Sequence, residues 1–289
     1  MLEFKKKSAC IIGLGKIGFS YNSSSKSKIK SHYKALKKSK YFNLVGGVDH
    51  KRNKKFNKFN LPIFKSVKIL SKNFNPYLLI ISVPTKYHLA VFNDVVKYLK
   101  PKIILFEKPL TNNYIDAKRI VNLCKKKKIY LFVNYIRNYL PNLSQLKKLV
   151  SSKKVLVTLN YSGNFLNDFC HYFYLFDYLF GSKLYFKSKN TQNMFKNCKL
   201  QIKKNSKNKK DSIKIKGKNF LVDWKNNNIV NIKNKSHKIK INLDIDNYQY
   251  HVFNNIAQNI FFKKKNCTIE GKEALKFHRI FNDKKIKIN

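Results

Sequence analysis

The chain has 289 residues, of which 43% are hydrophobic, so it is long enough for two domains and too apolar for a wholly disordered polymer. Its 62 lysines and arginines face 14 acidic residues, which gives a formal net charge of +48. An excess of this size suggests a nucleic-acid or membrane partner, but only four of the basic residues are arginine and no recognition motif accompanies them.

The lysines are spread over the whole length, and Asn, Ile, Phe and Tyr are over-represented as well. All five residue types have A/T-rich codons, so a coding bias explains the charge better than a specific nucleic-acid site does. The charge still has a physical effect, because a basic surface attracts anionic substrates and cofactors. We therefore expect an anionic small-molecule substrate and no specific nucleic-acid partner.

The cysteines are odd in number and none has C-x-x-C spacing, which predicts reduced cytosolic thiols and no metal site. They are Cys10, Cys124, Cys170, Cys198 and Cys267. The N-terminus is basic and then apolar, but its apolar part is too short for a signal peptide. No apolar run approaches the roughly 20 residues of a membrane-spanning helix. We expect a cytoplasmic protein with no membrane partner.

A strand predicted over residues 8–13 leads into a G-x-G-x-x-G motif, Gly13 to Gly18. A helix follows towards Lys40, interrupted or extended by a Ser- and Lys-rich insert at 22–30, and a second strand over 43–49 ends at Asp49. In this context the motif predicts a dinucleotide site: its glycines give a tight turn and close approach to a pyrophosphate, and the acidic residue binds the adenosine ribose. The predicted cofactor contacts here are Gly13, Gly15, Lys16, Ile17, Gly18 and Asp49. A glycine turn without a ligand is the alternative.

Strands and helices then alternate. Residues 51–60 are a basic helix or loop, and the apolar runs 77–83, 102–106 and 129–133 are predicted strands separated by helices over 87–100 and 112–127. Continuous apolar strands that alternate with helices are typical of a buried parallel sheet with helices on both faces. We therefore expect a doubly wound Rossmann domain over residues 1–137.

After Asn134 the pattern changes. We expect helices over 139–152 and 167–180, a strand over 154–161, four to six antiparallel strands between 183 and 243, and closing helices over 246–262 and 270–281. Gly181 is a natural end for the aromatic helix 167–180. These elements predict an α/β second domain over residues 138–289 with an open, mainly antiparallel sheet. Its last helix could pack back on the first domain.

Four short segments occur in an order and at a spacing that are typical of one enzyme family. They are Pro84-Thr85-Lys86-Tyr87-His88, Glu107-Lys108-Pro109, Asn134-Tyr135-Ile136-Arg137 and Asp168-Phe169-Cys170-His171, the last followed by Leu179-Phe180-Gly181. In order and spacing these segments resemble the glucose–fructose oxidoreductase / inositol dehydrogenase (Gfo/Idh/MocA) family. The resemblance runs from about residue 8 to residue 280.

The resemblance implies an NAD-dependent oxidoreductase, with NADP as an alternative, that transfers hydride between nicotinamide and a secondary hydroxyl of a sugar or nucleotide sugar. Asp49 favours NAD, because a carboxylate repels a 2′-phosphate, whereas Lys51 and Arg52 could accept one. Further cofactor-binding positions implied by the resemblance are Ser82, Pro84, Thr85, His88, Glu107, Lys108 and Arg137. For His88 and Arg137, a structural role or a contact on the pyrophosphate side is the stronger reading than catalysis.

Three residues are the implied catalytic groups. Lys108 would orient the substrate hydroxyl and share its proton, because its pKa can fall in a site crowded with cations. His171 would be the acid or base of the second domain, since imidazole titrates near neutrality. Asp168, about one turn earlier, would orient His171 or contact the substrate. Each has a plainer reading: a solvated lysine, a core histidine and a helix-terminal acid.

Two departures from the family pattern bear on the substrate. Tyr174 stands where the family helix has an acidic residue, and the stretch between strand 154–161 and Asp168 is very short. The chain therefore resembles the short-loop branch, which is associated with surface-polysaccharide and nucleotide-sugar genes. A non-catalytic dinucleotide-binding or regulatory member is the alternative function. The resemblance also implies a homo-oligomer that pairs through the second-domain sheet.

Overall fold

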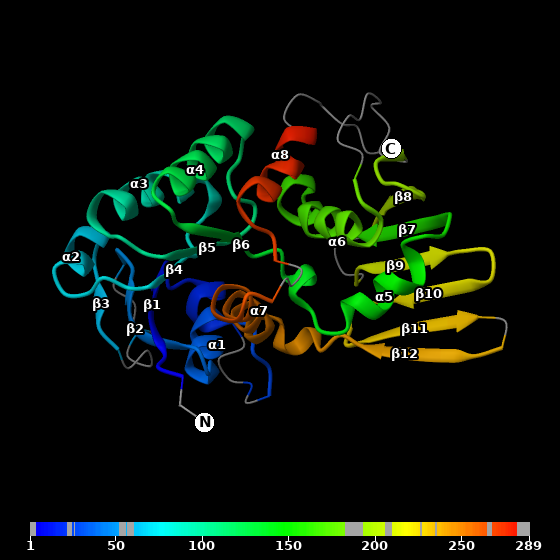
Figure 1. Cartoon of the computed structure of the whole chain (residues 1–289), viewed down its shortest axis with the longest axis horizontal. Helices are drawn as coiled ribbons and strands as arrows, with labels where there is room; N and C mark the ends of the chain where they lie inside the picture. The colour runs from blue at the N-terminus through cyan, green and yellow to red at the C-terminus, as the bar shows by residue number, and fades with distance from the viewer. Residues whose placement is uncertain are drawn as a thin grey trace. The chain divides into compact units, whose positions relative to one another are not determined.

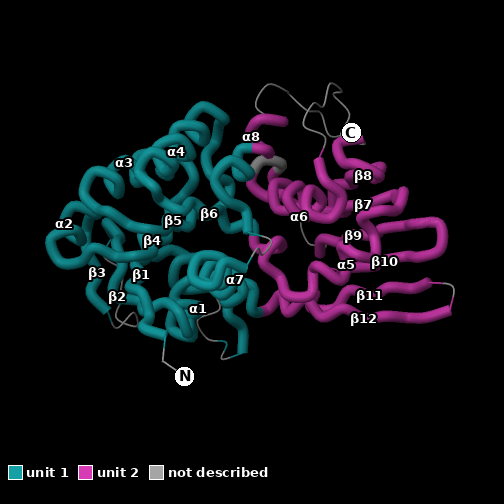
Figure 2. Tube along the Cα trace, viewed as in Figure 1, with its two compact units in different colours: residues 1–135, 247–275 teal, residues 136–246, 276–289 magenta. Residues whose placement is uncertain are grey.

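The computed structural model divides into two compact units, which Figure 2 distinguishes by colour. It describes residues 4–21, 25, 27–51, 56, 61–182, 193–205, 210–225, 227–234, 236–264 and 268–281. Unit 1 comprises Met1–Tyr135 and Asn247–Leu275, and unit 2 comprises Ile136–Asp246 and Lys276–Asn289. The first domain was predicted to end at residue 137, but the chain returns to unit 1 for residues 247–275. Most of the segment 51–60, expected as a helix or loop, lies outside the described residues.

Unit 1 is built on a parallel sheet of six strands in the order β3-β2-β1-β4-β5-β6. The strands are β1 (Lys7–Ile12), β2 (Phe42–Val48), β3 (Ile63–Phe64), β4 (Leu78–Ile81), β5 (Ile103–Phe106) and β6 (Tyr130–Val133). Every residue of β4 and β5 is buried, as the continuous apolar runs predicted. This order is that of a dinucleotide-binding sheet, so the predicted Rossmann domain is confirmed.

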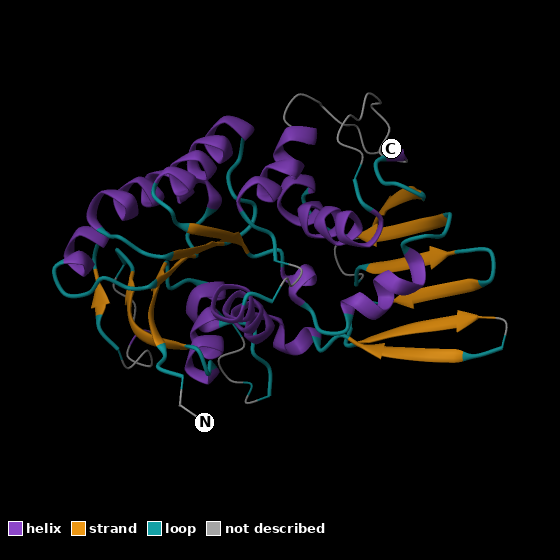
Figure 3. Cartoon of the chain, viewed as in Figure 1, coloured by secondary structure: helices purple, strands orange, loops and turns teal. Residues whose placement is uncertain are grey.

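Helices cover both faces of this sheet, and in Figures 1 and 3 α3 and α4 lie together on one face while α1 and α7 lie on the other. The helices are η1 (Lys16–Ser20), α1 (His32–Lys38), α2 (Val67–Ser71), η3 (Thr85–Tyr87), α3 (His88–Tyr98), α4 (Tyr114–Lys126), α7 (Tyr248–Phe262) and η8 (Gly271–Ala274). The caps follow from sequence: Ser31 and Asn113 side chains accept backbone N–H groups at the starts of α1 and α4. The helix expected after the glycine motif is broken by the polar insert.

Residues 247–275 belong to unit 1 because hydrogen bonds tie them to its first helix region. The Asn247 side chain accepts the Ile29 N–H at 3.2 Å, and the Tyr248 hydroxyl donates to the Lys30 carbonyl at 3.1 Å. At the far end of α7 the Gln258 amide donates to the Tyr41 hydroxyl at 2.9 Å. A long-range return of this kind leaves no local sequence signal.

Unit 2 is built on a mixed six-stranded sheet in the order β12-β11-β10-β9-β7-β8. The strands are β7 (Val155–Tyr161), β8 (Cys198–Lys204), β9 (Ser212–Lys216), β10 (Phe220–Trp224), β11 (Ile229–Asn234) and β12 (Lys238–Asn242). All neighbouring pairs are antiparallel except β7 and β8, which run parallel, so the expectation of an antiparallel region from 183 to 243 is wrong for β8. The strands alternate buried and exposed residues, so one face is open.

The helices of unit 2 are η4 (Ile136–Tyr139), α5 (Leu143–Val150), η5 (Phe165–Phe169), α6 (Cys170–Phe180), η7 (Ile245–Asn247) and α8 (Leu275–Phe281). Helix α6 is buried almost all round, which its aromatic sequence requires, since a helix without a polar face belongs in a core. Gly181 ends it as predicted, with φ +73° and its N–H on the Asp177 carbonyl at 2.8 Å.

The four cysteines that the structure describes are free and buried, whereas Cys267 lies outside the described residues. Burial raises the pKa of Cys10, Cys124 and Cys198 to about 12. The thiolate is the form that attacks a disulfide reagent, so we expect these thiols to react only after unfolding. Labelling with a chromogenic disulfide at pH 8, with and without guanidinium, measures this. Fast labelling of three or more thiols in the native protein would contradict it.

Candidate active site

The glycine motif forms a turn that is fastened to β2. Gly13 has φ +92°, a conformation that side chains rarely adopt, and its N–H donates to the Val48 carbonyl at 2.8 Å. The next N–H, that of Leu14, donates to Asp49 Oδ2 at 2.9 Å. The glycine turn and Asp49 are therefore in direct contact, although the polar insert lies between them in the sequence.

The space around this turn fits a dinucleotide. An added Cβ at Gly18 would lie 2.1 Å from the Gly13 carbonyl oxygen, so helix and strand pack too closely for any side chain. At Gly15 an added Cβ would meet nothing within 4 Å, which leaves open space at the backbone where a pyrophosphate approaches in this fold. The Ser82 hydroxyl oxygen, at the end of β4, is buried with no hydrogen-bond partner among the described residues.

Asp49 stands at the end of β2, where the motif places the ribose-binding acid. Its side chain is 15% exposed, and its Oδ1 accepts the Lys51 N–H at 2.9 Å while Oδ2 holds Leu14. Each carboxylate oxygen still has a lone pair for a ribose hydroxyl. The motif predicts a ribose contact for Asp49, which stays a prediction, but gives no signal that Asp49 also shapes the turn.

His88, for which the sequence offers a structural or a cofactor-side role, lies between two turns. Its side chain is fully buried, with Nδ1 2.9 Å from the Leu110 carbonyl and Nε2 3.0 Å from the Val83 carbonyl. Burial lowers the pKa of His88 below its ordinary value, against the opposing effect of these hydrogen bonds. Because both ring nitrogens face backbone carbonyls, His88 joins the turns after β4 and β5, and it has no nitrogen left for a cofactor. Pro84 and Thr85 form the first of these turns.

Glu107 and Lys108 follow directly on β5. Glu107 Oε1 accepts hydrogen bonds from His32 Nε2 at 2.8 Å and from Asn134 Nδ2 at 2.7 Å. Burial alone would raise the pKa of Glu107, but these partners and the Lys108 charge hold the pKa below its usual range. Lys108 is half-buried, and the peptide bond between Lys108 and Pro109 is cis. Since all strands are parallel, both residues lie at the same sheet edge as the glycine turn.

Arg137, predicted as a cofactor contact, lies in unit 2 and is engaged there. It is 7% exposed; its Nη2 donates to the Tyr172 hydroxyl at 2.9 Å, and its guanidinium carbon lies 4.2 Å above the Tyr172 ring. The Tyr172 hydroxyl donates in turn to Asp211 Oδ2 through a short hydrogen bond. Asp211 also accepts the N–H of Ser162 at 2.9 Å. Neither Tyr172 nor Asp211 was predicted, because no motif marks them.

The two remaining catalytic candidates, Asp168 and His171, also lie in unit 2, where Asp168 precedes α6 and His171 is in its first turn. Asp168 Oδ2 accepts the Asn164 N–H at 2.7 Å, and His171 is 8% exposed. Burial raises the pKa of Tyr161, and the charges of Asp168 and Asp211 raise it further. Two carboxylates therefore lie near this hydroxyl, at the end of β7.

We expect Tyr172→Phe to lower the free energy of unfolding by about 2 kcal/mol, because it leaves the buried Arg137 and the half-buried Asp211 without their shared hydroxyl. Urea denaturation followed by circular dichroism measures the change. Tyr130→Phe, at a ring that is 52% exposed, is the matched control. Equal stabilities of the two variants would show that the hydroxyl contributes nothing.

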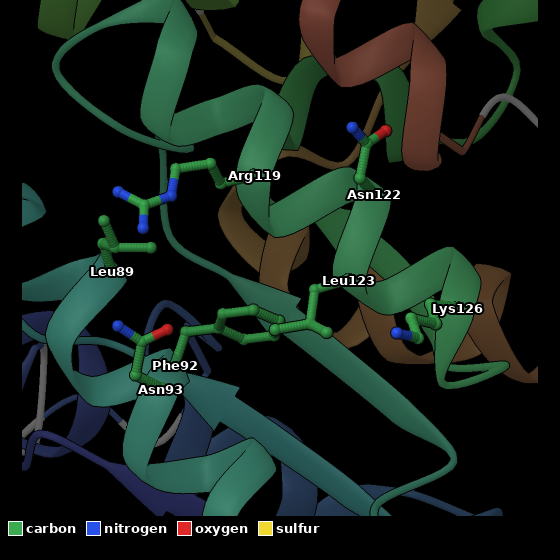
Figure 4. Close-up of a pocket in the computed structure, with 7 residues that line it drawn as sticks. All are labelled: Leu89, Phe92, Asn93, Arg119, Asn122, Leu123 and Lys126. Atoms are coloured by element: carbon green, nitrogen blue, oxygen red, sulfur yellow. The ribbon is translucent and has the colours of Figure 1, made fainter.

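Away from these residues, a hollow of about 370 Å³ lies between α3 and α4 of unit 1 (Figure 4). It is lined by Leu89, Phe92, Asn93, Arg119, Asn122, Leu123 and Lys126, none of which was a predicted site residue. In the part of the chain that the structure describes, no cluster of three metal-binding side chains occurs. No helix there is long and apolar enough to cross a membrane.

Comparison with protein families agrees with this geometry. Residues 7–135 match the oxidoreductase family with an NAD-binding Rossmann fold, that is, the Gfo/Idh/MocA family. The matched region contains the whole parallel sheet of unit 1. Over this region the chain is matched by an NAD-binding Rossmann fold of oxidoreductases, which agrees with the predicted dinucleotide cofactor. No curated protein matches the chain in sequence.

Solved structures share the fold over nearly the whole length. A dehydrogenase (MviM) from Clostridium difficile superimposes with a TM-score of 0.73 at 18% identity, covering 96% of this chain and 97% of that one. UDP-N-acetylglucosamine 3-dehydrogenase GnnA from Acidithiobacillus ferrooxidans gives 0.71 at 13% identity, with coverages of 96% and 97%. The WlbA dehydrogenase from Bordetella pertussis, in complex with NADH and UDP-GlcNAcA, gives 0.68 at 16% identity, with coverages of 96% and 95%. At these identities the likeness shows the fold alone.

Proposed function

We propose that this NAD-binding oxidoreductase transfers hydride between nicotinamide and the carbon of a secondary hydroxyl in a sugar or nucleotide sugar. The observation that carries the proposal is the position of Lys108. It follows β5 at the carboxyl edge of the sheet, two strands from the glycine turn after β1. Ligands of open parallel sheets bind at this edge.

Three residues, Lys108, His171 and Asp168, have separate roles in the proposed reaction. Oxidation of a secondary alcohol removes a hydride from carbon and a proton from oxygen, and bound NAD supplies the hydride acceptor. Lys108 donates a hydrogen bond that orients the substrate hydroxyl and shares its proton. His171 accepts that proton or returns it in the reverse direction, and Asp168 orients the imidazole or binds a substrate hydroxyl. The family resemblance supports these roles.

A nucleotide sugar is the substrate class that we favour. Two structurally similar proteins, GnnA and WlbA, are described with UDP-sugars in their names or complexes. The net charge of +48 also favours an anionic substrate, because it raises the local concentration of anions. Asp49 supports NAD over NADP, since it would repel a 2′-phosphate. We further propose a homo-oligomer that pairs through the open face of the unit 2 sheet, on the family resemblance alone.

Nicotinamide absorbance with a pooled panel of UDP-sugars and free polyols tests the proposal. We expect NAD reduction with at least one pool, and splitting that pool then identifies the substrate. Absence of turnover with every pool, while NADH binds, would overturn the dehydrogenase function and favour a non-catalytic dinucleotide-binding protein.

A further inference from the structure

A buried histidine lies behind the acidic residue of the Glu107-Lys108-Pro109 turn. His32, the first residue of α1, is fully buried, and its Nε2 lies 2.8 Å from Glu107 Oε1. The edge of its ring packs against Phe253 of α7, with ring centroids 5.7 Å apart. Its other nitrogen, Nδ1, has no partner among the described residues, so the ring has a single polar contact there.

The contact holds the Glu107 carboxylate in one orientation. His32 and Asn134 both donate to Oε1, and Asn134 is itself buried and donates to Gln249 Oε1 at 3.1 Å. No group in the described parts of the chain bonds to Glu107 Oε2, and the side chain is 14% exposed. One oxygen is therefore fixed from the protein interior, and the other is left for a ligand.

His32 reaches this position because the helix after the glycine turn is interrupted. The short η1 ends at Ser20, and α1 begins only at His32, where the Ser31 hydroxyl caps it by accepting the Lys34 N–H at 3.3 Å. The return of α7 to unit 1 then closes over the imidazole. Two features that are remote in sequence thus converge on Glu107.

We propose that His32 is a positioning residue for the nicotinamide half of NAD, acting through Glu107. In the sheet order, Asp49 at the end of β2 and Glu107 at the end of β5 lie on opposite sides of the glycine turn after β1. Asp49 is on the adenosine side, so Glu107 is on the nicotinamide side. By fixing Oε1, His32 directs Oε2 towards the nicotinamide ribose and holds the backbone from which Lys108 extends.

The test measures binding to the cofactor-free protein by NADH fluorescence, with ADP as a competing second ligand. His32→Leu removes the donor, and His32→Gln retains one on its amide. We expect His32→Leu to weaken NADH binding about tenfold or more, because a hydrogen bond to a charged group is lost, and to leave the binding of ADP, which lacks the nicotinamide ribose, within about twofold. We expect His32→Gln to recover most of the NADH affinity. His278→Leu, at a buried histidine of unit 2, is the matched control.

A double-mutant cycle with Glu107→Gln separates positioning from stability. If His32 acts through Glu107, His32→Leu changes NADH affinity little in the Glu107→Gln background. Additive losses, equal loss of NADH and ADP binding, or NADH binding by folded His32→Leu at wild-type affinity would each overturn the proposal. If His32→Leu fails to fold, His32→Phe, which keeps a ring against Phe253 and has no donor, is measured with the same two ligands. The inference depends on the NAD site and not on the substrate, so a failed substrate panel does not affect it.

Discussion

Lys108→Ala is expected to lower kcat by a factor of about 10² to 10⁴, the usual contribution of a general acid or base, and to leave NADH affinity within a few-fold. The side chain follows β5 and is half-buried at the sheet edge, so its removal opens no core cavity. Steady-state rates with the substrate found in the panel, and NADH fluorescence, measure the two quantities. A loss in kcat without a matching loss in binding identifies a role in the chemical step.

The matched control is Lys102→Ala, an exposed lysine at the opposite end of the same strand. It removes the same charge from a protein with 62 lysines and arginines, so it should behave like the wild type. Lys108→Arg keeps the charge but cannot release a proton, and we expect it to be as slow as Lys108→Ala. Full activity of Lys108→Ala would show that the proton is held elsewhere.

Gly15→Ala and Gly18→Ala are both expected to weaken NADH binding, but for different reasons. At Gly15 the backbone has φ −71° and an added Cβ meets nothing, so the variant should unfold at nearly the wild-type temperature. Its methyl group would occupy the space for the pyrophosphate, and we expect NADH affinity to fall about tenfold or more. At Gly18 the added Cβ lies 2.1 Å from a backbone oxygen, so we expect a loss of about 1–3 kcal/mol of stability as well as of NADH binding.

Thermal unfolding without cofactor, followed by NADH titration, separates the two effects. Gly271→Ala, at another glycine with open space around an added Cβ, is a control for the substitution itself. Its positive φ of 40° predicts a modest loss of stability and unchanged NADH affinity. Wild-type NADH affinity in Gly15→Ala would mean that the open space at this turn is not the cofactor site.

The sequence predicted the parts of the protein whose signal is local. The apolar runs before Asp49, Ser82 and Glu107 predicted strands, which the structure contains as β2, β4 and β5. Such runs are a local signal because strands buried on both faces need continuous apolar residues. The glycine motif predicted its own turn, since only glycine fits φ +92° at Gly13 and the close packing at Gly18. The family resemblance supplied the positions of Lys108, Asp168 and His171.

Contacts between distant residues were decided only by the tertiary structure. The parallel pairing of β8 with β7 follows from the path of the chain between them. The alternation of buried and exposed residues in β8 would be the same in a parallel or an antiparallel pair, so the sequence does not reveal it. That His88 joins two turns was also decided there, because both of its partners are backbone carbonyls that carry no side-chain signal.

By itself, the sequence determined the class of fold, the NAD fingerprint and the order of the motifs, because each depends on residues close together in the chain. Only the tertiary structure decided that α7 returns to unit 1, that His32 supports Glu107, and that Tyr172 links Arg137 to Asp211. Those contacts join residues 35 to more than 200 positions apart. Their partners are selected by burial and hydrogen-bond satisfaction in the folded core, which no local pattern records.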